Sequence, residues 1–300
     1  MTTIEWTDET WNPVTGCEKI SPGCKHCYAK ALHDMRHQAF LNGKNMPAQY
    51  AAPFESVRLW PERLKIPLRW RAPRLCFVNS MSDLFHEDVP LAFIDDVLEV
   101  IHATPHITYQ VLTKRAERLE RGLYGQEGAY FARTLGGGDY LANLWIGVSV
   151  EDKKHLDRLE YLRAIEAAVR MVSFDPLLED LGKVNLQGIG WAIAGGESGR
   201  GAGVRPMHPD WVRSLRDQCL DQGVPFFFKQ WGEWAPLEQF RPGDKADKGV
   251  LFFPGIDHCF QRAGKKHAGA LLDGREWREF PKPYPGHAVV RLQRKKAVAA

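Results

Sequence analysis

The sequence predicts an α/β fold in which parallel strands curl into a partial or near-complete (β/α) barrel of the TIM type, with a C-terminal appendage. Two observations predict it. Continuous apolar segments, typical of strands buried on both faces, alternate with segments whose apolar residues recur at helical spacing. Polar residues follow nearly every apolar segment, and the sites of parallel α/β folds lie at such carboxyl ends.

The alternation begins with a short strand within residues 10–16 and a helix over 27–43 that stops at Gly43. Further strands are predicted at 74–81, 107–114, 144–150, 169–178, 189–198 and 224–232. The amphipathic helices between them are predicted at 89–105, 115–123, 152–168 and 208–223. The chain therefore contains about seven βα units.

The composition of the chain changes after residue 232. We expect residues 1–232 to form the barrel and residues 233–300, rich in Gly and Pro with short apolar runs, to form an extension packed on it. The segment KKHAGALLDGREW in this extension has two interpretations. Its basic residues and Trp277 form a surface for phosphate and base stacking, or Trp277 anchors the tail.

The overall composition is that of an ordinary globular protein, with 44% hydrophobic and 26% charged residues in a chain of 300. No run of about eighteen apolar residues is present, so no membrane span is expected. The first residues lack the basic and apolar regions of a signal peptide. We therefore expect a cytoplasmic protein, or one in the bacterial host cytoplasm if a phage encodes it, with its thiols reduced.

A nucleic-acid partner is one of two interpretations of the basic and aromatic residues. The net charge of +3 is small, but residues 63–74 and 291–296 are local positive runs, and ten Trp residues are present. Such a mixture suits a surface that stacks bases and neutralises phosphates. The alternative is that these charges form solvated faces and the Trp side chains lie in the core.

Three of the six cysteines, Cys17, Cys24 and Cys27, lie within one Gly- and Pro-containing loop. A disulfide would leave one of them over in a reducing compartment. A zinc site needs four ligands, for which His26 is a conceivable addition. Three thiolates without an obvious fourth ligand favour a [4Fe–4S] cluster with one iron open to substrate. The loop follows the first predicted strand, so these cysteines are expected at the barrel mouth.

Polar residues at the strand ends form the rest of the predicted site. They are Asn79, Ser80, Ser82, Asp83, Thr113, Lys114, Ser149, Glu151, Ser173, Asp175, Gly195, Gly196, Glu197, Ser198, Lys229 and Gln230. We take Lys229 and Glu197 as the candidate catalytic residues. Several of these residues also have structural interpretations: Asp83 as a helix cap, Glu151 as a first-turn helix residue, and Gly195 and Gly196 as a tight connection.

The cysteine spacing C-x6-C-x2-C, followed by the aromatic Tyr28, resembles the radical S-adenosylmethionine superfamily, whose commoner spacing has three residues in the first gap. More closely, the segments TWNPVTGC, SPGCKHCYA, VNSMSDLFH, VLTKR, IGVSVE, SFDPLL, AGGESG, FFFKQWG and LLDGREW resemble a phage and prophage family that is radical-SAM-like and related to photoproduct lyases. This resemblance extends over nearly the whole chain.

The resemblance implies two cofactors, a [4Fe–4S] cluster on Cys17, Cys24 and Cys27 and S-adenosylmethionine on its open iron. It also implies roles for other cofactor-binding residues. Asn79, Ser80, Ser82 and Asp83 would bind the methionine amino group, Ser149 and Glu151 the ribose hydroxyls, and Gly195 and Gly196 would admit the adenine or the substrate.

The resemblance further implies an isomerase or lyase that acts through a 5′-deoxyadenosyl radical and takes its electron from a donor such as flavodoxin or ferredoxin. The expected substrate is a nucleobase or nucleotide in phage DNA hypermodification. Two other functions remain open, a photoproduct-lyase-like repair enzyme and a zinc-stabilised nucleic-acid-binding module.

Overall fold

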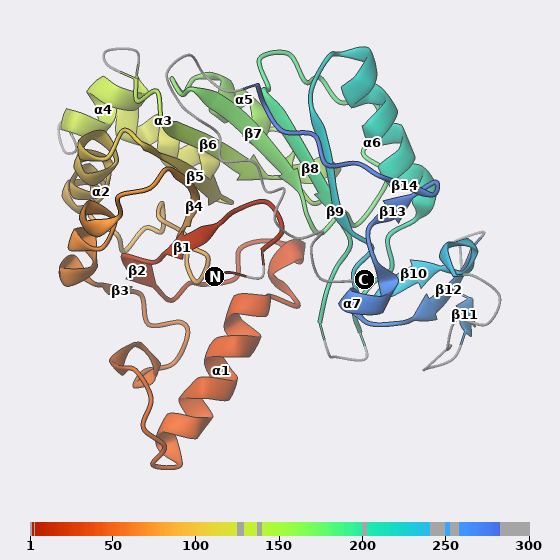
Figure 1. The fold of residues 1–300 in the computed structure, drawn as a ribbon, viewed down its shortest axis with the longest axis horizontal. Helices are drawn as coiled ribbons and strands as arrows, with labels where there is room; N and C mark the ends of the chain where they lie inside the picture. Colours follow the sequence, from red (N-terminus) through yellow and green to blue (C-terminus); the bar gives the residue numbers. More distant parts are fainter. Residues whose placement is uncertain are drawn as a thin grey trace.

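The structure is a computed structural model that describes residues 2, 4–124, 129–136, 140–199, 203–240, 250–252 and 258–282. Its main element is a seven-stranded sheet in the order β1-β4-β5-β6-β7-β8-β9. All pairs within this sheet are parallel. The sheet is curled into a half-barrel, so the predicted fold class is confirmed in its partial form (Figure 1).

The strands lie where continuous apolar runs predicted them. They are β1 (Glu9–Trp11), β4 (Arg74–Val78), β5 (Ile107–Thr113), β6 (Leu144–Ser149), β7 (Val169–Phe174), β8 (Trp191–Gly195) and β9 (Phe226–Gln230). A separate two-stranded ladder pairs β2 (Val14–Thr15) with β3 (Arg58–Leu59) beside the cysteine loop. Burial on both faces explains why the long strands carry few polar residues before their carboxyl ends.

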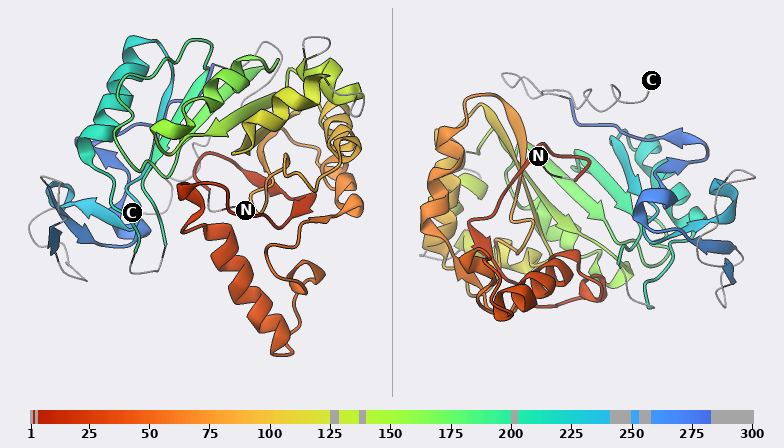
Figure 2. Two further views of the ribbon diagram at one scale, coloured as in Figure 1. Left: turned by 180° about the vertical axis from the view of Figure 1, so that it is seen from behind. Right: turned by 60° about the horizontal axis from the view of Figure 1, so that its bottom comes forward.

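The helices α2 to α6 lie on the outer face of the curled sheet, whereas α1 projects away from it (Figure 2). They are α1 (Tyr28–Leu41), α2 (Leu91–Ala103), α3 (Ala116–Tyr124), α4 (Ala129–Leu135), α5 (Arg158–Arg163) and α6 (Pro209–Asp221). The helix predicted over residues 152–168 is much shorter than expected. A 3-10 turn, η5 (Lys153–His155), precedes α5 because Glu151 and Asp152 are buried and hold the chain against the sheet.

Two apolar layers follow from the alternation of side chains along each strand. Cys76 and Val78 of β4 face the helices and join the larger core. Leu75 and Phe77 of the same strand face the inside of the half-barrel, where they pack with other strand residues and with Trp6. This inner cluster fills the half-barrel below the carboxyl ends of the strands.

The C-terminal extension adds small antiparallel elements beside β9. Strands β10 (Trp234–Pro236), β11 (Val250–Phe252) and β12 (Cys259–Arg262) form a three-stranded sheet. The short helix α7 (Lys265–Ala268) and the hairpin of β13 (Leu271–Leu272) and β14 (Arg275–Glu276) follow. The basic run at 291–296 lies outside the described residues. Among the described helices, none is both long and apolar enough to cross a bilayer.

Candidate active site

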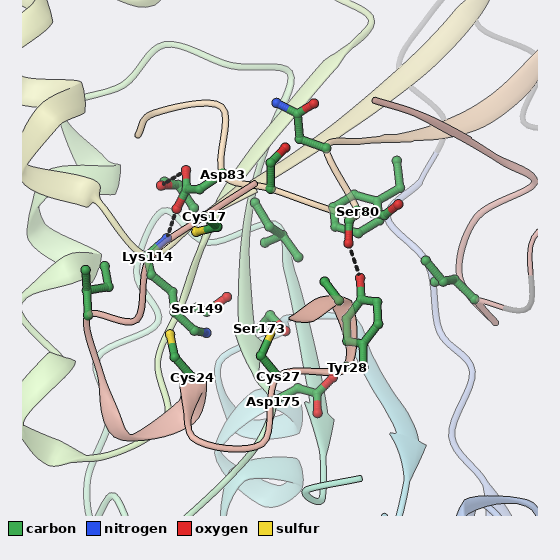
Figure 3. A pocket seen from close by; sticks show the side chains of 18 of the residues that line it. Cys17, Cys24, Cys27, Tyr28, Ser80, Asp83, Lys114, Ser149, Ser173 and Asp175 are labelled. Carbon is green, nitrogen blue, oxygen red and sulfur yellow. Dashed lines mark hydrogen bonds between the residues drawn. The ribbon is translucent and has the colours of Figure 1, made fainter. Parts of the chain in front are cut away.

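A cavity of about 350 Å³ lies at the carboxyl ends of the strands and brings most of the predicted site together (Figure 3). The predicted residues that line it are Cys17, Cys24, Cys27, Asn79, Ser80, Ser82, Asp83, Thr113, Lys114, Ser149, Ser173, Asp175, Ser198 and Lys229. The structure therefore places these strand-end residues around one cavity, and their roles stay predictions. Glu151, Gly195, Gly196 and Glu197 lie outside this lining, in the layer that supports it.

The cysteine loop enters the cavity through Gly16, whose φ of +91° is in the left-handed region. A Cβ at Gly16 would lie 2.3 Å from the carbonyl oxygen of Ser56, so only glycine fits there. Gly16 also forms a parallel bridge with Ser82, and the backbone N–H of Cys17 donates to the carbonyl of Phe54 at 2.9 Å. These contacts fix Cys17 at the entrance to the loop.

The other two cysteines mark the end of the loop. Cys24 closes a 3-10 turn, η1 (Pro22–Cys24), and its sulfur lies 3.6 Å from the hydroxyl of Ser21. Cys27 is the N-cap of α1. Figure 3 shows Cys17, Cys24 and Cys27 around one side of the cavity, with the Lys114 side chain extending toward them. The loop therefore presents three thiols to one space from two short turns.

The three thiols are free, so the disulfide alternative is not what the structure contains. Burial, followed by the negative charge of Asp83, raises the pKa of Cys17 to about 11. Burial also raises the pKa of Cys27. The negative charge of Cys24 adds to both effects, so Cys24 lies close enough to act electrostatically on Cys17 and on Cys27.

Three cysteines can bind either a single metal ion or an iron–sulfur cluster. Across the described ranges, no three His, Cys, Asp or Glu side chains converge as ligands of a single metal ion. A cubane cluster has no such requirement, because each thiolate binds a different iron at its corner. Three reduced cysteines around one cavity, with cationic side chains beside them, fit a [4Fe–4S] cluster better than zinc.

Asp83 is the centre of a buried network at the end of β4. Its carboxylate accepts hydrogen bonds from the N–H of Phe85 (3.0 Å), the hydroxyl of Thr113 (2.7 Å) and the N–H of Lys114 (3.1 Å). It also forms an ion pair with Arg115 at 3.3 Å. The bond to Phe85 is local, and α2 begins only at Leu91, so Asp83 does not cap that helix. It joins the ends of β4 and β5.

The polar residues that follow β4 form hydrogen bonds with the segments before and after the cysteines. The hydroxyl of Ser82 donates to the carbonyl of Val14, and that of Ser80 donates to the side-chain oxygen of Asn12. Asn79 has a φ of +59°, and its side-chain oxygen accepts from the N–H of Val14. The Ser80 carbonyl accepts a 2.6 Å hydrogen bond from the Tyr28 hydroxyl. The residues after β4 thus connect the first strands to the cysteine loop.

Glu151 is fully buried behind the cysteine loop. Its carboxylate accepts from the N–H of Gly23 at 3.3 Å and from Arg158 at 2.9 Å. Burial alone would raise the pKa of Glu151, but Lys114, Ser21 and Arg158 outweigh it and hold that pKa below its usual value. The carboxylate is therefore ionised and joins the end of β6 to the loop.

Glu197 and the glycines before it hold the loop from the opposite side. The Glu197 carboxylate is bound by the guanidinium and the N–H of Arg205, and Arg205 also donates to the carbonyl of Pro22 at 2.9 Å. A Cβ at Gly196 would lie 1.9 Å from the carbonyl oxygen of Trp231, so this glycine permits close backbone contact. At Gly195 the nearest atom would be a carboxylate oxygen of Asp175, at 3.1 Å.

Lys229 lines the same cavity as the cysteines and forms an ion pair with Asp175, which follows β7. Burial lowers the pKa of Lys229, but Asp175 outweighs burial and holds it above its usual value, so the side chain is an ammonium ion. Asp175 and Ser173 line the same cavity. Lys114 and Asp175 were predicted at strand ends without an assigned role, whereas Arg115 was not predicted, although the segment VLTKR contains it.

The C-terminal extension contributes Lys265 to the cavity lining, where it pairs with Glu5 at 3.2 Å. Trp277 is buried, donates to the carbonyl of Leu272 at 3.3 Å and packs between the guanidinium groups of Arg216 and Arg275. Of the two interpretations of this segment, anchoring by Trp277 describes the structure.

The fold and site together define a class of protein: a parallel half-barrel with a three-thiol loop and a polar cavity at its mouth. The chain matches the family described as Protein of unknown function (DUF5131) over residues 1–281, and it belongs to that family. No curated protein matches the chain.

Solved structures of spore photoproduct lyase are distantly similar to this chain. One mutant of that enzyme is 12% identical with a TM-score of 0.41, over 85% of this chain and 68% of the other. A complex with dinucleoside spore photoproduct is 11% identical with a TM-score of 0.36, over 83% and 67%. A double mutant with bound AdoMet and dinucleoside spore photoproduct is 10% identical with a TM-score of 0.36, over 84% and 68%.

Proposed function

We propose that this protein is a radical S-adenosylmethionine enzyme whose [4Fe–4S] cluster is held by Cys17, Cys24 and Cys27. The observation that carries the proposal is that one loop presents three free thiols to a cavity at the carboxyl ends of parallel strands. When bound, the cluster and S-adenosylmethionine supply a 5′-deoxyadenosyl radical after one-electron reduction by a flavodoxin- or ferredoxin-type donor.

The positive charge of the residues beside the thiols matches the negative charge of a cluster bound by three thiolates. Lys114 and Arg115 line the same cavity and offset the negative charge that three thiolates introduce. Glu151 and Glu197 hold the turn around Gly23 from two sides, so we assign them to loop support. In this proposal Glu197 is a positioning residue, because its carboxylate is occupied by Arg205.

S-adenosylmethionine would occupy the remaining polar wall of the cavity. Asn79, Ser80 and Ser82 lie at the end of β4 and Ser149 at the end of β6, all on the cavity wall. We propose that they surround the amino acid and ribose parts of the cofactor. Gly195 and Gly196 shape the connection after β8, where the space beside them is filled by Asp175 and by the Trp231 backbone, so we assign them to support of the cavity wall.

We propose a nucleobase or nucleotide as the substrate, as expected for an enzyme of DNA modification. Aromatic side chains suited to base stacking line the cavity, namely Trp6, Tyr28, Phe54 and Phe77. Lys229 and Lys265 add positive charge suited to phosphate. The Lys229 ammonium would bind or protonate the substrate, with Asp175 fixing its position.

Anaerobic reconstitution with iron and sulfide tests the cofactor proposal. We expect roughly four irons per chain and a brown chromophore. Cys17→Ser, Cys24→Ser and Cys27→Ser should each lose most of both. Cys219→Ser and Cys259→Ser are matched controls that should retain them, because neither cysteine lines the cavity. A colourless protein with one zinc would instead support the nucleic-acid-binding alternative.

Nucleoside analysis tests the substrate proposal. The reconstituted protein is incubated with S-adenosylmethionine, a reductant and either DNA with modified bases or DNA with pyrimidine photoproducts. We expect 5′-deoxyadenosine together with an altered nucleoside from the modified DNA. Conversion of the photoproduct alone would identify a repair lyase, and unchanged nucleosides in both samples would contradict a nucleobase substrate.

A further inference from the structure

Arg115 makes a contact that the proposed cofactor role of the cysteines does not explain by itself. Its guanidinium donates to the sulfur of Cys17 at 3.5 Å and to a carboxylate oxygen of Asp83 at 3.3 Å. A second guanidinium nitrogen lies 3.5 Å from the carbonyl of Glu18. The Arg115 side chain is only 8% exposed. A buried cation is therefore aimed at one specific thiol.

The position of Arg115 is fixed by its neighbours. Asp83 is itself held by three donors from two segments, so it cannot follow the guanidinium if that group moves. Thr113 connects both residues, because its hydroxyl donates to Asp83 and accepts from the N–H of Arg115 at 2.9 Å. This arrangement orients the guanidinium toward the sulfur of Cys17.

The other two cysteines have different partners. Cys24 lies near the Ser21 hydroxyl, and Cys27 lies near the N–H groups of Ala29 and Lys30. In the described parts of the chain, Cys17 is the one member of the three with a guanidinium within hydrogen-bond distance. The electrostatic surroundings of the three sulfurs are thus unequal.

We infer that Arg115 is a positioning residue that raises the reduction potential of the cluster through Cys17. The inference rests on the proposed function. Reduction adds one negative charge to the cluster, and a buried guanidinium that donates to a ligating sulfur stabilises the reduced form more than the oxidised form. Asp83 opposes part of this effect by its own negative charge while it holds Arg115 in place.

An EPR-monitored redox titration of the reconstituted protein tests this role. Arg115→Gln removes the charge and keeps an N–H donor. We expect the ratio of reduced to oxidised cluster at a fixed potential to fall at least tenfold. For a one-electron couple, this corresponds to a midpoint potential that is lower by about 59 mV. Arg115→Lys should shift the ratio less. Arg121→Gln is the matched control, since Arg121 is exposed and pairs with Glu87, and its ratio should equal that of the wild type.

Asp83→Asn provides a second variant with the opposite sign. Asparagine removes the carboxylate charge and keeps a side-chain oxygen that can accept from Arg115, so the ratio of reduced to oxidised cluster should rise. If Arg115→Gln does not retain iron, Arg115→Lys decides the matter, because the inference requires a lower ratio in that variant than in the wild type. Wild-type potentials in both Arg115→Gln and Asp83→Asn, with full iron content, would overturn the inference and leave the proposed function intact. A wild-type protein that binds no cluster would instead overturn the proposed function itself.

Discussion

The carboxylate of Glu151 accepts a hydrogen bond from the backbone N–H of Gly23, although 128 residues separate them in the sequence. The same turn is held from its other side, because Arg205 donates to the carbonyl of Pro22 across 183 residues and is itself bound by Glu197. The conformation of the cysteine loop therefore depends on residues from the second half of the sheet.

Replacing Glu151 should weaken both the fold and the loop. Glu151→Ala leaves the buried Arg158 guanidinium without its carboxylate, and breaking such a pair costs about 3–5 kcal/mol in the free energy of unfolding. Urea unfolding measures this loss. Glu160→Ala is the control, since Glu160 is exposed on α5, and it should change stability by less than about 0.5 kcal/mol. Equal free energies of unfolding in the two variants would show that the Glu151–Arg158 ion pair does not stabilise the fold.

Gly196 should tolerate no side chain. In Gly196→Ala the new methyl group would lie 1.9 Å from the Trp231 carbonyl oxygen, so the connection after β8 must move. We expect a loss of about 1–3 kcal/mol or more in thermal or urea unfolding. Gly195→Ala, whose nearest neighbour is the movable Asp175 side chain, should lose less than about 1 kcal/mol. A larger loss of stability in Gly195→Ala than in Gly196→Ala would contradict the close contact between Gly196 and the Trp231 backbone.

Lys229 should affect turnover and leave cofactor loading unchanged. Lys229→Met removes the ammonium that faces the cavity, and we expect kcat/KM to fall by about 10²-fold or more. Iron content should equal that of the wild type, because Lys229 has no contact with the thiols. Lys154→Met, at an exposed lysine, is the control and should retain full activity. Loss of iron in Lys229→Met would place this residue in cofactor binding.

Asp273 should make stability depend on pH in the acidic range. Burial raises the pKa of Asp273, but hydrogen bonds from Arg213 and Arg216 outweigh it and hold that pKa below its usual value of about 3.9. The folded state is therefore stabilised above pH ~3.9, and this contribution is lost as the pH falls through the lower folded-state pKa.

Asp273→Asn isolates that contribution. Asparagine tolerates the positive φ of 54° at this position, so the backbone is preserved. At pH 7 the variant should be less stable by up to about 1 kcal/mol, since the side chain is 40% exposed. The difference should shrink toward zero below pH ~3.9. A difference that is independent of pH would exclude the carboxylate as its source.

Most of the sheet could be predicted from the sequence, because strands buried on both faces leave continuous apolar runs. The segment IGWAIAGGES, for example, predicted β8 closely. The helix over residues 152–168 was predicted too long. Its apolar periodicity is that of a helix, and α5 forms within this segment. At the start of the segment, burial of Glu151 and Asp152 overrides helix propensity.

The site could be predicted only in part. Cysteine spacing and strand-end polarity identified the residues that share the cavity. The partners of Glu151 and Glu197 could not be predicted, because a sequence does not show which distant N–H or guanidinium a carboxylate will meet. The contact of Arg115 with Cys17 is also formed by packing between distant segments.

The dependence of the cysteine loop on Glu151 and Arg205 has a consequence for biosynthesis. The three cysteines are synthesised before Glu151 and Arg205, since synthesis proceeds from the N-terminus to the C-terminus. The turn between them acquires its supports only after the chain has been extended through β8 to Arg205. Under the proposed function, the cluster would be inserted only after the strands up to β8 and Arg205 have been synthesised and folded.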